Sequence, residues 1–155
     1  MRRLALLTLL LAAGCSSEAV CTAIGTPVGV ALHIARPLAA EVSDATMEVC
    51  WDGACKQVGV ELRPSTRAAR ETCSGDSCRA EEVQTGEKNG FGDVAGLPKR
   101  PVTVRLTLRG ARAKPLLERR LEVTPKGRFP NGPECGEGGP NVVLTVAADG
   151  SVRES

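Results

Sequence analysis

Hydrophobic and polar residues alternate along six stretches of the chain. The most regular is residues 101–110, PVTVRLTLRG, where Val and Leu at even positions alternate with Thr and Arg at odd positions. The same two-residue period recurs in PVGVALHIA, TMEVCW, CKQVGVEL, LLERRLEV and NVVLTVAA. This period is typical of antiparallel strands that pack one face on a core and expose the other. The pattern therefore predicts six or seven short strands.

Proline and glycine punctuate these stretches, at ARPLA, GLPKRP, VTPKG, PNGPECGEGGPN and ADGS. Such residues favour turns between strands, and no long amphipathic helix pattern lies between them. We therefore expect an all-β domain with the architecture of an immunoglobulin-like antiparallel β-sandwich. A small β-barrel is the alternative. Residues 21–155 are expected to form this single domain.

One stretch breaks the pattern. Residues 63–93, RPSTRAARETCSGDSCRAEEVQTGEKNGFGD, are polar and rich in turn-forming residues. Because so few of these residues are apolar, the stretch can bury little surface. We expect a long polar loop within the domain.

The N-terminus has the plan of an exported protein. Arg2 and Arg3 precede an apolar run, and small residues lead into Cys15 in the sequence LAAGC. The run is too short to span a bilayer comfortably and is typical of a signal peptide. LAAGC resembles the bacterial lipobox, although Ala12 stands where Leu is usual. Residues 1–14 are thus predicted to be a lipoprotein signal peptide.

The lipobox implies that Cys15 receives a diacylglyceryl group and becomes the first residue of the mature chain. Residues 15–20 would then be a short tether to the domain. Two acyl chains on one residue give stable membrane attachment. We expect the protein on the extracytoplasmic face of the bacterial cell membrane. A plain signal peptide cut near Gly14 is the alternative.

Charge and composition limit the kinds of partner that the protein is expected to bind. Without Arg2 and Arg3 the chain has 18 basic and 18 acidic residues, and it contains one Trp, two Phe and no Tyr. A nucleic-acid binder is normally basic and offers aromatic rings for stacking, so nucleic acid is not an expected partner. Residues 99–155 carry 11 basic and 6 acidic residues. They could meet anionic lipid or a wall polymer, or simply form solvated strand faces.

Six cysteines remain after Cys15, and an even number in an exported protein indicates disulfides. In CWDGAC, a two-residue Asp-Gly turn makes Cys50 and Cys55 a cross-strand pair, with Cα atoms about 4.5 Å apart. Trp51 would then point to the core and both cysteines away from it. CSGDSC places Cys73 opposite Cys78 in the same way. We predict both as hairpin disulfides.

Cys21 and Cys135 remain partly by elimination, and their disulfide would tie the two ends of the domain together. The alternative is a four-cysteine zinc site made from the two C-x4-C pairs, although this spacing is at the edge of what such sites use. Thiolates rarely survive in an oxidising exterior. We therefore predict three disulfides and no cofactor.

Other candidates for chemistry are weak. His33 is the single histidine, and it alternates to the polar face of its strand, where histidine is usually a surface residue. The glycine-rich CGEGGPN lacks the Lys-Ser/Thr of a phosphate-binding loop, and no G-x-S-x-G nucleophile motif occurs. No catalytic residue is predicted, although a site assembled from loops would escape detection.

Several segments carry a family resemblance. LAAGC, VCTAIGTPVGV, CWDGAC, GFGDVAGLPKRPVTVRLTL and PNGPECGEGGPNVVLTVAADGSV together resemble a group of small secreted actinobacterial lipoproteins of uncharacterised function. The resemblance implies a lipid anchor at Cys15 and supplies no activity or ligand. The sequence therefore predicts a non-catalytic envelope module that binds a protein or cell-wall ligand or has a structural role. A metal-binding or enzymatic envelope protein is the alternative.

Overall fold

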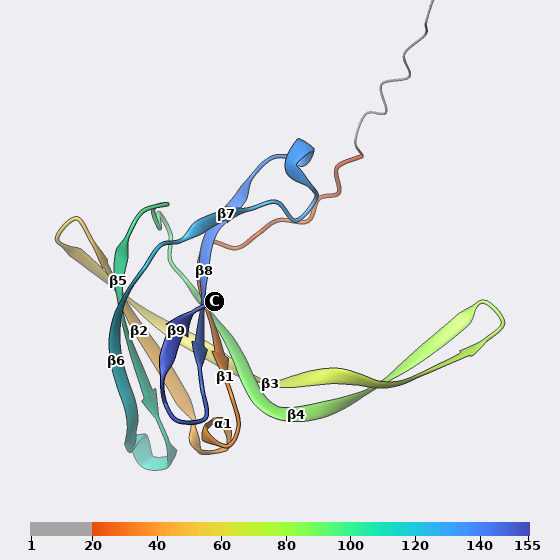
Figure 1. The fold of residues 1–155 in the computed structure, drawn as a ribbon, viewed down its shortest axis with the longest axis horizontal. Helices are drawn as coiled ribbons and strands as arrows, with labels where there is room; N and C mark the ends of the chain where they lie inside the picture. Colours follow the sequence, from red (N-terminus) through yellow and green to blue (C-terminus); the bar gives the residue numbers. More distant parts are fainter. Residues whose placement is uncertain (1–19) are drawn as a thin grey trace, which may run out of the picture.

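The alternating apolar positions form the strands that the pattern predicts, and further strands join them. The computed structural model describes residues 20–155 (Figure 1). Its elements are β1 (Gly29–Ile34), α1 (Leu38–Glu41), β2 (Asp44–Trp51), β3 (Ala54–Ser74), β4 (Ser77–Asp93), β5 (Val102–Arg109), β6 (Pro115–Val123), β7 (Lys126–Arg128), β8 (Gly138–Val146) and β9 (Val152–Glu154), with 3-10 turns at Ala111–Ala113 and Pro133–Cys135.

These strands form one continuous sheet in the order β6-β5-β2-β3-β4-β1-β8-β7, and β9 pairs with β8. Neighbouring strands are antiparallel except β1 and β8, which run parallel. The sheet curls so that its two halves face each other (Figure 1). The all-β, disulfide-linked class is confirmed. Its form is a half-barrel, which lies between the predicted sandwich and the barrel alternative.

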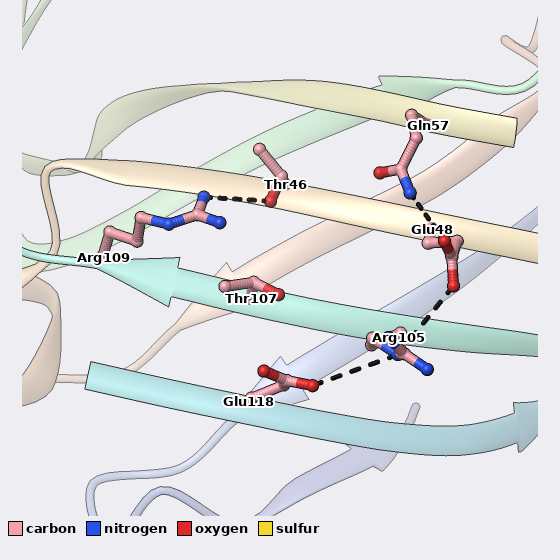
Figure 2. A pocket seen from close by; sticks show the side chains of 7 residues that line it. All are labelled: Thr46, Glu48, Gln57, Arg105, Thr107, Arg109 and Glu118. Carbon is pink, nitrogen blue, oxygen red and sulfur yellow. Dashed lines mark hydrogen bonds and ion pairs between the residues drawn. The ribbon is translucent and has the colours of Figure 1, made fainter. Parts of the chain in front are cut away.

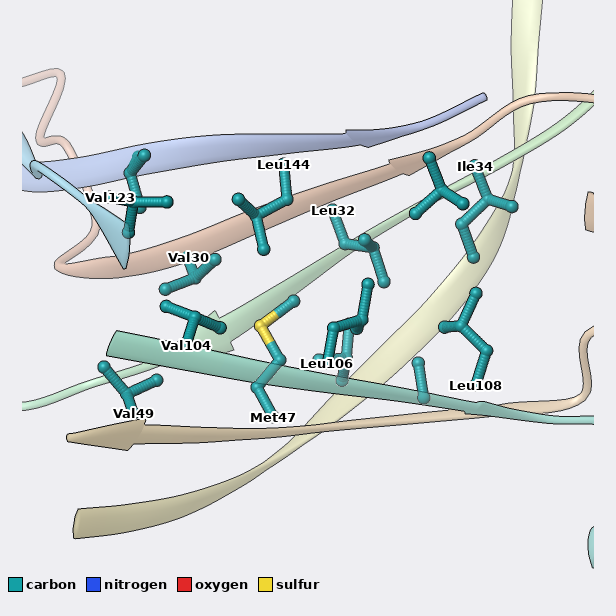
Figure 3. Close-up of a cluster of buried hydrophobic side chains, with 14 of the residues drawn as sticks. Val30, Leu32, Ile34, Met47, Val49, Val104, Leu106, Leu108, Val123 and Leu144 are labelled. Carbon is teal, nitrogen blue, oxygen red and sulfur yellow. The ribbon is translucent and has the colours of Figure 1, made fainter. Parts of the chain in front are cut away.

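The core lies inside the curl (Figure 3). Leu32 from β1, Met47 from β2, Leu106 from β5 and Leu144 from β8 are all buried in one cluster. Burying a side chain of this size stabilises a fold by about 1.5–3 kcal/mol. Because the four strands come from both halves of the sheet, this cluster holds the curl together.

The predicted loop over residues 63–93 is wrong, because these residues form the outer part of β3 and all of β4. The two strands pair as a long hairpin that projects from the half-barrel (Figure 1). Every residue from Thr66 to Glu82 is exposed. A two-stranded ribbon outside the core has no buried face, so it shows no alternation of apolar and polar residues. We call residues 66–82 the arm.

The predicted signal peptide, Cys15 and most of the predicted tether lie outside the described residues. Within residues 20–155, none of the helices has the length and apolar character needed to cross a bilayer.

Candidate functional site

The first cysteine pair lies at the β2–β3 turn. Cys50 and Cys55 are cross-strand partners joined by a disulfide, with a Cα–Cα distance of 4.0 Å. Asp52 and Gly53 both have positive φ, 50° and 77°, as a type I′ turn requires. Trp51 packs against the core, so the disulfide lies on the outer face as predicted.

An ion pair fastens this turn to the loop before β5. Arg100 donates a hydrogen bond from its guanidinium to the Asp52 carboxylate. That hydrogen bond lowers the pKa of Asp52 below its ordinary value and raises the pKa of Arg100. Both groups are solvent-exposed, and exposed pairs of this kind add little to stability.

The second pair closes the tip of the arm. Cys73 and Cys78 face each other across the β3–β4 turn and form a disulfide with a Cα–Cα distance of 4.0 Å. Gly75 has φ 58°, and Asp76 does not share the positive φ. This is the pattern of a type II′ turn, which places glycine first.

The structure does not bring the four hairpin cysteines together. Cys55 and Cys73 lie near opposite ends of β3. At about 3.3 Å per residue, the strand between them spans up to roughly 60 Å, whereas zinc–sulfur bonds are about 2.3 Å long. The two pairs therefore cannot share one zinc ion.

The structure places one carboxylate beside each hairpin disulfide. A carboxylate oxygen of Glu48 lies within 4.8 Å of the Cys50 and Cys55 sulfurs, and Glu71 is placed likewise beside Cys73 and Cys78. Neither glutamate was predicted from the sequence. The repeated sequence pattern E-x-C-x4-C could have indicated them, because residues two apart on a strand share a face. The sulfurs are in disulfides, so neither group offers thiolate ligands.

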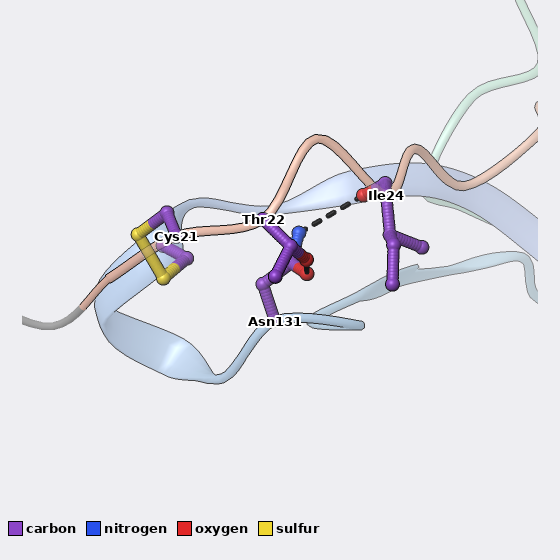
Figure 4. Close-up of a disulfide and its surroundings, with 5 residues drawn as sticks. Cys21, Thr22, Ile24 and Asn131 are labelled. Atoms are coloured by element: carbon purple, nitrogen blue, oxygen red, sulfur yellow. Dashed lines mark hydrogen bonds between the residues drawn. A yellow bond between two sulfur atoms is a disulfide. The ribbon is translucent and has the colours of Figure 1, made fainter.

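The third disulfide ties together the two ends of the domain. Cys21 bonds Cys135 with a Cα–Cα distance of 5.4 Å across a sequence separation of 114. Figure 4 shows Asn131 beside the same N-terminal segment. Its Nδ2 donates to the Ile24 carbonyl at 2.9 Å, and its side-chain oxygen accepts from the Thr22 hydroxyl. All three disulfides join the pairs that the sequence predicts.

The outer face of β3, β2, β5 and β6 holds a shallow polar depression of about 260 Å³ (Figure 2). Arg105 Nε lies 3.8 Å from Glu48 and 4.0 Å from Glu118. Gln57 donates to Glu48 at 2.6 Å. One guanidinium thus bridges two carboxylates across three strands, which leaves a net charge of −1 at this end of the depression.

Arg109 completes the depression at its other end. Its guanidinium donates to Asp44 at 3.2 Å and to the Thr46 hydroxyl at 3.3 Å. The floor is therefore a lattice of paired charges and hydroxyl groups. Opposite charges across strands stabilise a solvated sheet face, which accounts for this arrangement without a ligand.

His33 lies on the outer face of β1, as its place in the alternation predicts. Its Nδ1 lies 2.5 Å from the Asn89 side-chain oxygen, and its Nε2 lies 3.7 Å from Glu87. About a third of the side chain is exposed. Among the described residues, no hydroxyl or thiol is hydrogen-bonded to this imidazole, so it lacks the partner that a nucleophilic mechanism requires.

The arm is the candidate binding element. Beyond Val60, the edge of β3 that faces away from β4 has no neighbouring strand among residues 20–155. Before Lys88, the edge of β4 that faces away from β3 has none either. Arg70 lies directly opposite Glu81 in the ribbon. Both residues line a second depression, of about 480 Å³, with Thr72, Arg79 and Ala80. The arm thus offers two open strand edges and a charged, hollowed face.

Comparison of the chain with protein-family models, curated proteins and solved structures finds no match.

Proposed function

We propose that the protein is a lipoprotein of the bacterial cell envelope, anchored through Cys15, and acts as a non-catalytic binding module. In this proposal the half-barrel is the scaffold, and the arm contacts the partner on the extracytoplasmic side of the membrane. The observation that carries the proposal is the fully exposed arm with a disulfide at its tip.

The arm has no role in building the core. Every residue from Thr66 to Glu82 is exposed, and isolated two-stranded hairpins are marginally stable in water. The Cys73–Cys78 disulfide and cross-strand pairs such as Arg70 with Glu81 hold the ribbon in shape. A disulfide-closed element that stabilises nothing else is best explained by an interaction outside the molecule.

The open edges favour a protein partner in extended conformation. Unpaired strand edges present rows of backbone N–H and C=O groups, which an added strand can pair. The positive and negative side chains of the ribbon would select the register of such a strand. Neighbouring exposed Arg and Glu side chains also discourage the arm from pairing with itself.

The polar face supports the non-catalytic part of the proposal. Glu48, Arg105 and Glu118 form an ion-paired row on that face, so each carboxylate is already held by the Arg105 guanidinium. A catalytic acid or base instead needs a free approach to a substrate proton.

Site-specific photocrosslinking in intact cells tests the arm. A photoreactive phenylalanine analogue replaces Ala69, which lies at a bulge in the arm. A matched probe replaces Gln57, which is exposed on the polar face. We expect a discrete protein adduct from position 69 and none from position 57.

Two results would contradict this assignment. An adduct from position 57 alone would move the binding surface to the polar face. An adduct from position 69 that is removed by wall-degrading enzymes and resists protease would make the partner a wall polymer and not a protein.

A further inference from the structure

Large exposed hydrophobic side chains gather at one end of the domain. Within residues 20–155 there are three, and Val20 is 93% exposed, Ile24 61% and Phe129 49%. Val20 and Ile24 belong to the segment before β1, and Phe129 directly follows β7. Single exposed hydrophobic residues are ordinary on protein surfaces. Three at one end, with none elsewhere in the described chain, indicate a surface that meets something apolar.

Covalent and hydrogen bonds hold the two segments side by side. The Cys21–Cys135 disulfide joins them, and Asn131 donates to the Ile24 carbonyl at 2.9 Å (Figure 4). Phe129 lies two residues before Asn131 in the same turn, where its carbonyl accepts a backbone hydrogen bond at 3.1 Å. We call residues 20–24 and 129–132 the platform. Its apolar side chains are carried on a fixed frame.

The length of the preceding chain limits what can cover the platform. An acylated Cys15 would lie five residues before Val20. Five residues reach at most about 18 Å when fully extended. The platform would therefore lie within about 18 Å of the bilayer surface. This step rests on the proposed function, because it requires the anchor at Cys15.

We propose that the platform rests on the lipid surface, with Ile24 and Phe129 inserted at the level of the headgroups. Apolar side chains of interfacial segments are buried about 5–10 Å into the boundary between headgroups and acyl chains. The arm carries no large exposed hydrophobic residue and stays in water. Together with the acyl chains, the platform fixes the orientation of the domain on the membrane.

Charge adds little to this contact. Lys99 pairs with Glu137 near the platform. The exposed Lys126 and Glu134 carry opposite charges on neighbouring segments. Arg128, directly before Phe129, donates to the Asn141 side chain at 2.8 Å. Together these five residues carry a net charge of +1, so the contact should depend mainly on apolar insertion. One positive charge near an anionic surface contributes about 1 kcal/mol, so anionic bilayers should bind the platform only slightly better than zwitterionic ones.

Fluorescence quenching in vesicles tests the proposal. The full-length protein is expressed with its leader, purified from membranes and reconstituted into phosphatidylcholine vesicles brominated near the glycerol end of the acyl chains. Trp51→Phe removes the native tryptophan, and Phe129→Trp places a reporter on the platform. A matched control carries Ser74→Trp at the arm tip. A second reporter, Ile24→Trp, covers the case that the first variant fails to fold.

We expect the bromines to quench the platform tryptophans, because groups at interfacial depth lie near the glycerol end of the acyl chains. The arm-tip tryptophan should keep its emission. Adding equal parts of phosphatidylglycerol or raising the salt concentration should change this difference only slightly. Protein that floats with the vesicles while its platform tryptophans stay unquenched would overturn the platform and leave the anchor intact. Protein that does not float and carries no acyl chain would overturn the proposed function itself.

Discussion

Removing the Cys21–Cys135 disulfide should destabilise the protein far more than removing either hairpin disulfide. The perturbation is Cys21→Ser with Cys135→Ser, and the matched control is Cys50→Ser with Cys55→Ser. The first bond closes a sequence separation of 114 residues and the second a separation of 5. All four substitutions exchange the same atoms, so the two pairs differ mainly in the loop that they close.

The magnitude follows from the entropy of the unfolded chain. In the loop-closure model, the long crosslink stabilises the fold by about 5 kcal/mol and the short one by about 2 kcal/mol. The segment around Cys21 is exposed and forms no strand, so its removal from the scaffold should cost few native contacts. We therefore expect the two double variants to differ by about 3 kcal/mol.

Urea denaturation followed by circular dichroism measures this difference, with linear extrapolation to water. Similar slopes in both variants are required for the comparison. Equal losses, or a larger loss for the hairpin pair, would refute the loop-closure reasoning. Such a result would mean that the strain or packing around Cys50 and Cys55 outweighs chain entropy.

Three further outcomes are expected. Leu106→Ala, in the centre of the core, should lower the free energy of unfolding by about 2–5 kcal/mol, and Thr107→Ala, its outward neighbour, by less than about 0.5 kcal/mol, both measured by urea denaturation. Trypsin should cut first in the arm, at sites such as Arg67. The two fragments should separate on a denaturing gel only after reduction, because the Cys21–Cys135 disulfide joins them; separation without reductant would contradict that disulfide. The Asp52–Arg100 pair lowers the pKa of Asp52, so its stabilising effect should be present above the unfolded-state pKa of about 4 and lost as the pH falls through the lowered value. Arg100→Gln should abolish that part of the acid dependence of stability, and an unchanged dependence of stability on pH would argue against the pair.

Much of the fold could be predicted from the sequence, because it depends on residues that are close together in the chain. In β5 the strict alternation of Val and Leu with Thr and Arg reports one buried face, and the structure buries Val102, Val104, Leu106 and Leu108. The β2–β3 turn could be predicted in the same way, because Asp-Gly favours a type I′ turn. That turn then sets Cys50 opposite Cys55 without any knowledge of the rest of the molecule.

The arm and the curl could not be predicted in the same way. Alternation marks a strand only when one of its faces is buried, and residues 66–82 have none. The parallel pairing of β1 with β8 joins residues more than a hundred positions apart, and it depends on how the whole sheet curls. The carboxylates beside the disulfides lie between these cases. Glu48 and Glu71 each precede a cysteine by two residues. Because residues two apart on a strand share a face, their place beside the cysteines could have been predicted.

The mass of the mature protein extracted from membranes tests the central claim most directly. A lipoprotein should begin at Cys15 and carry a diacylglyceryl group, with six further cysteines that resist alkylation before reduction. Cys15→Ser should abolish both the added lipid mass and the membrane association. A wild-type chain that begins at another residue, carries no lipid and leaves the membrane in high salt would contradict the account.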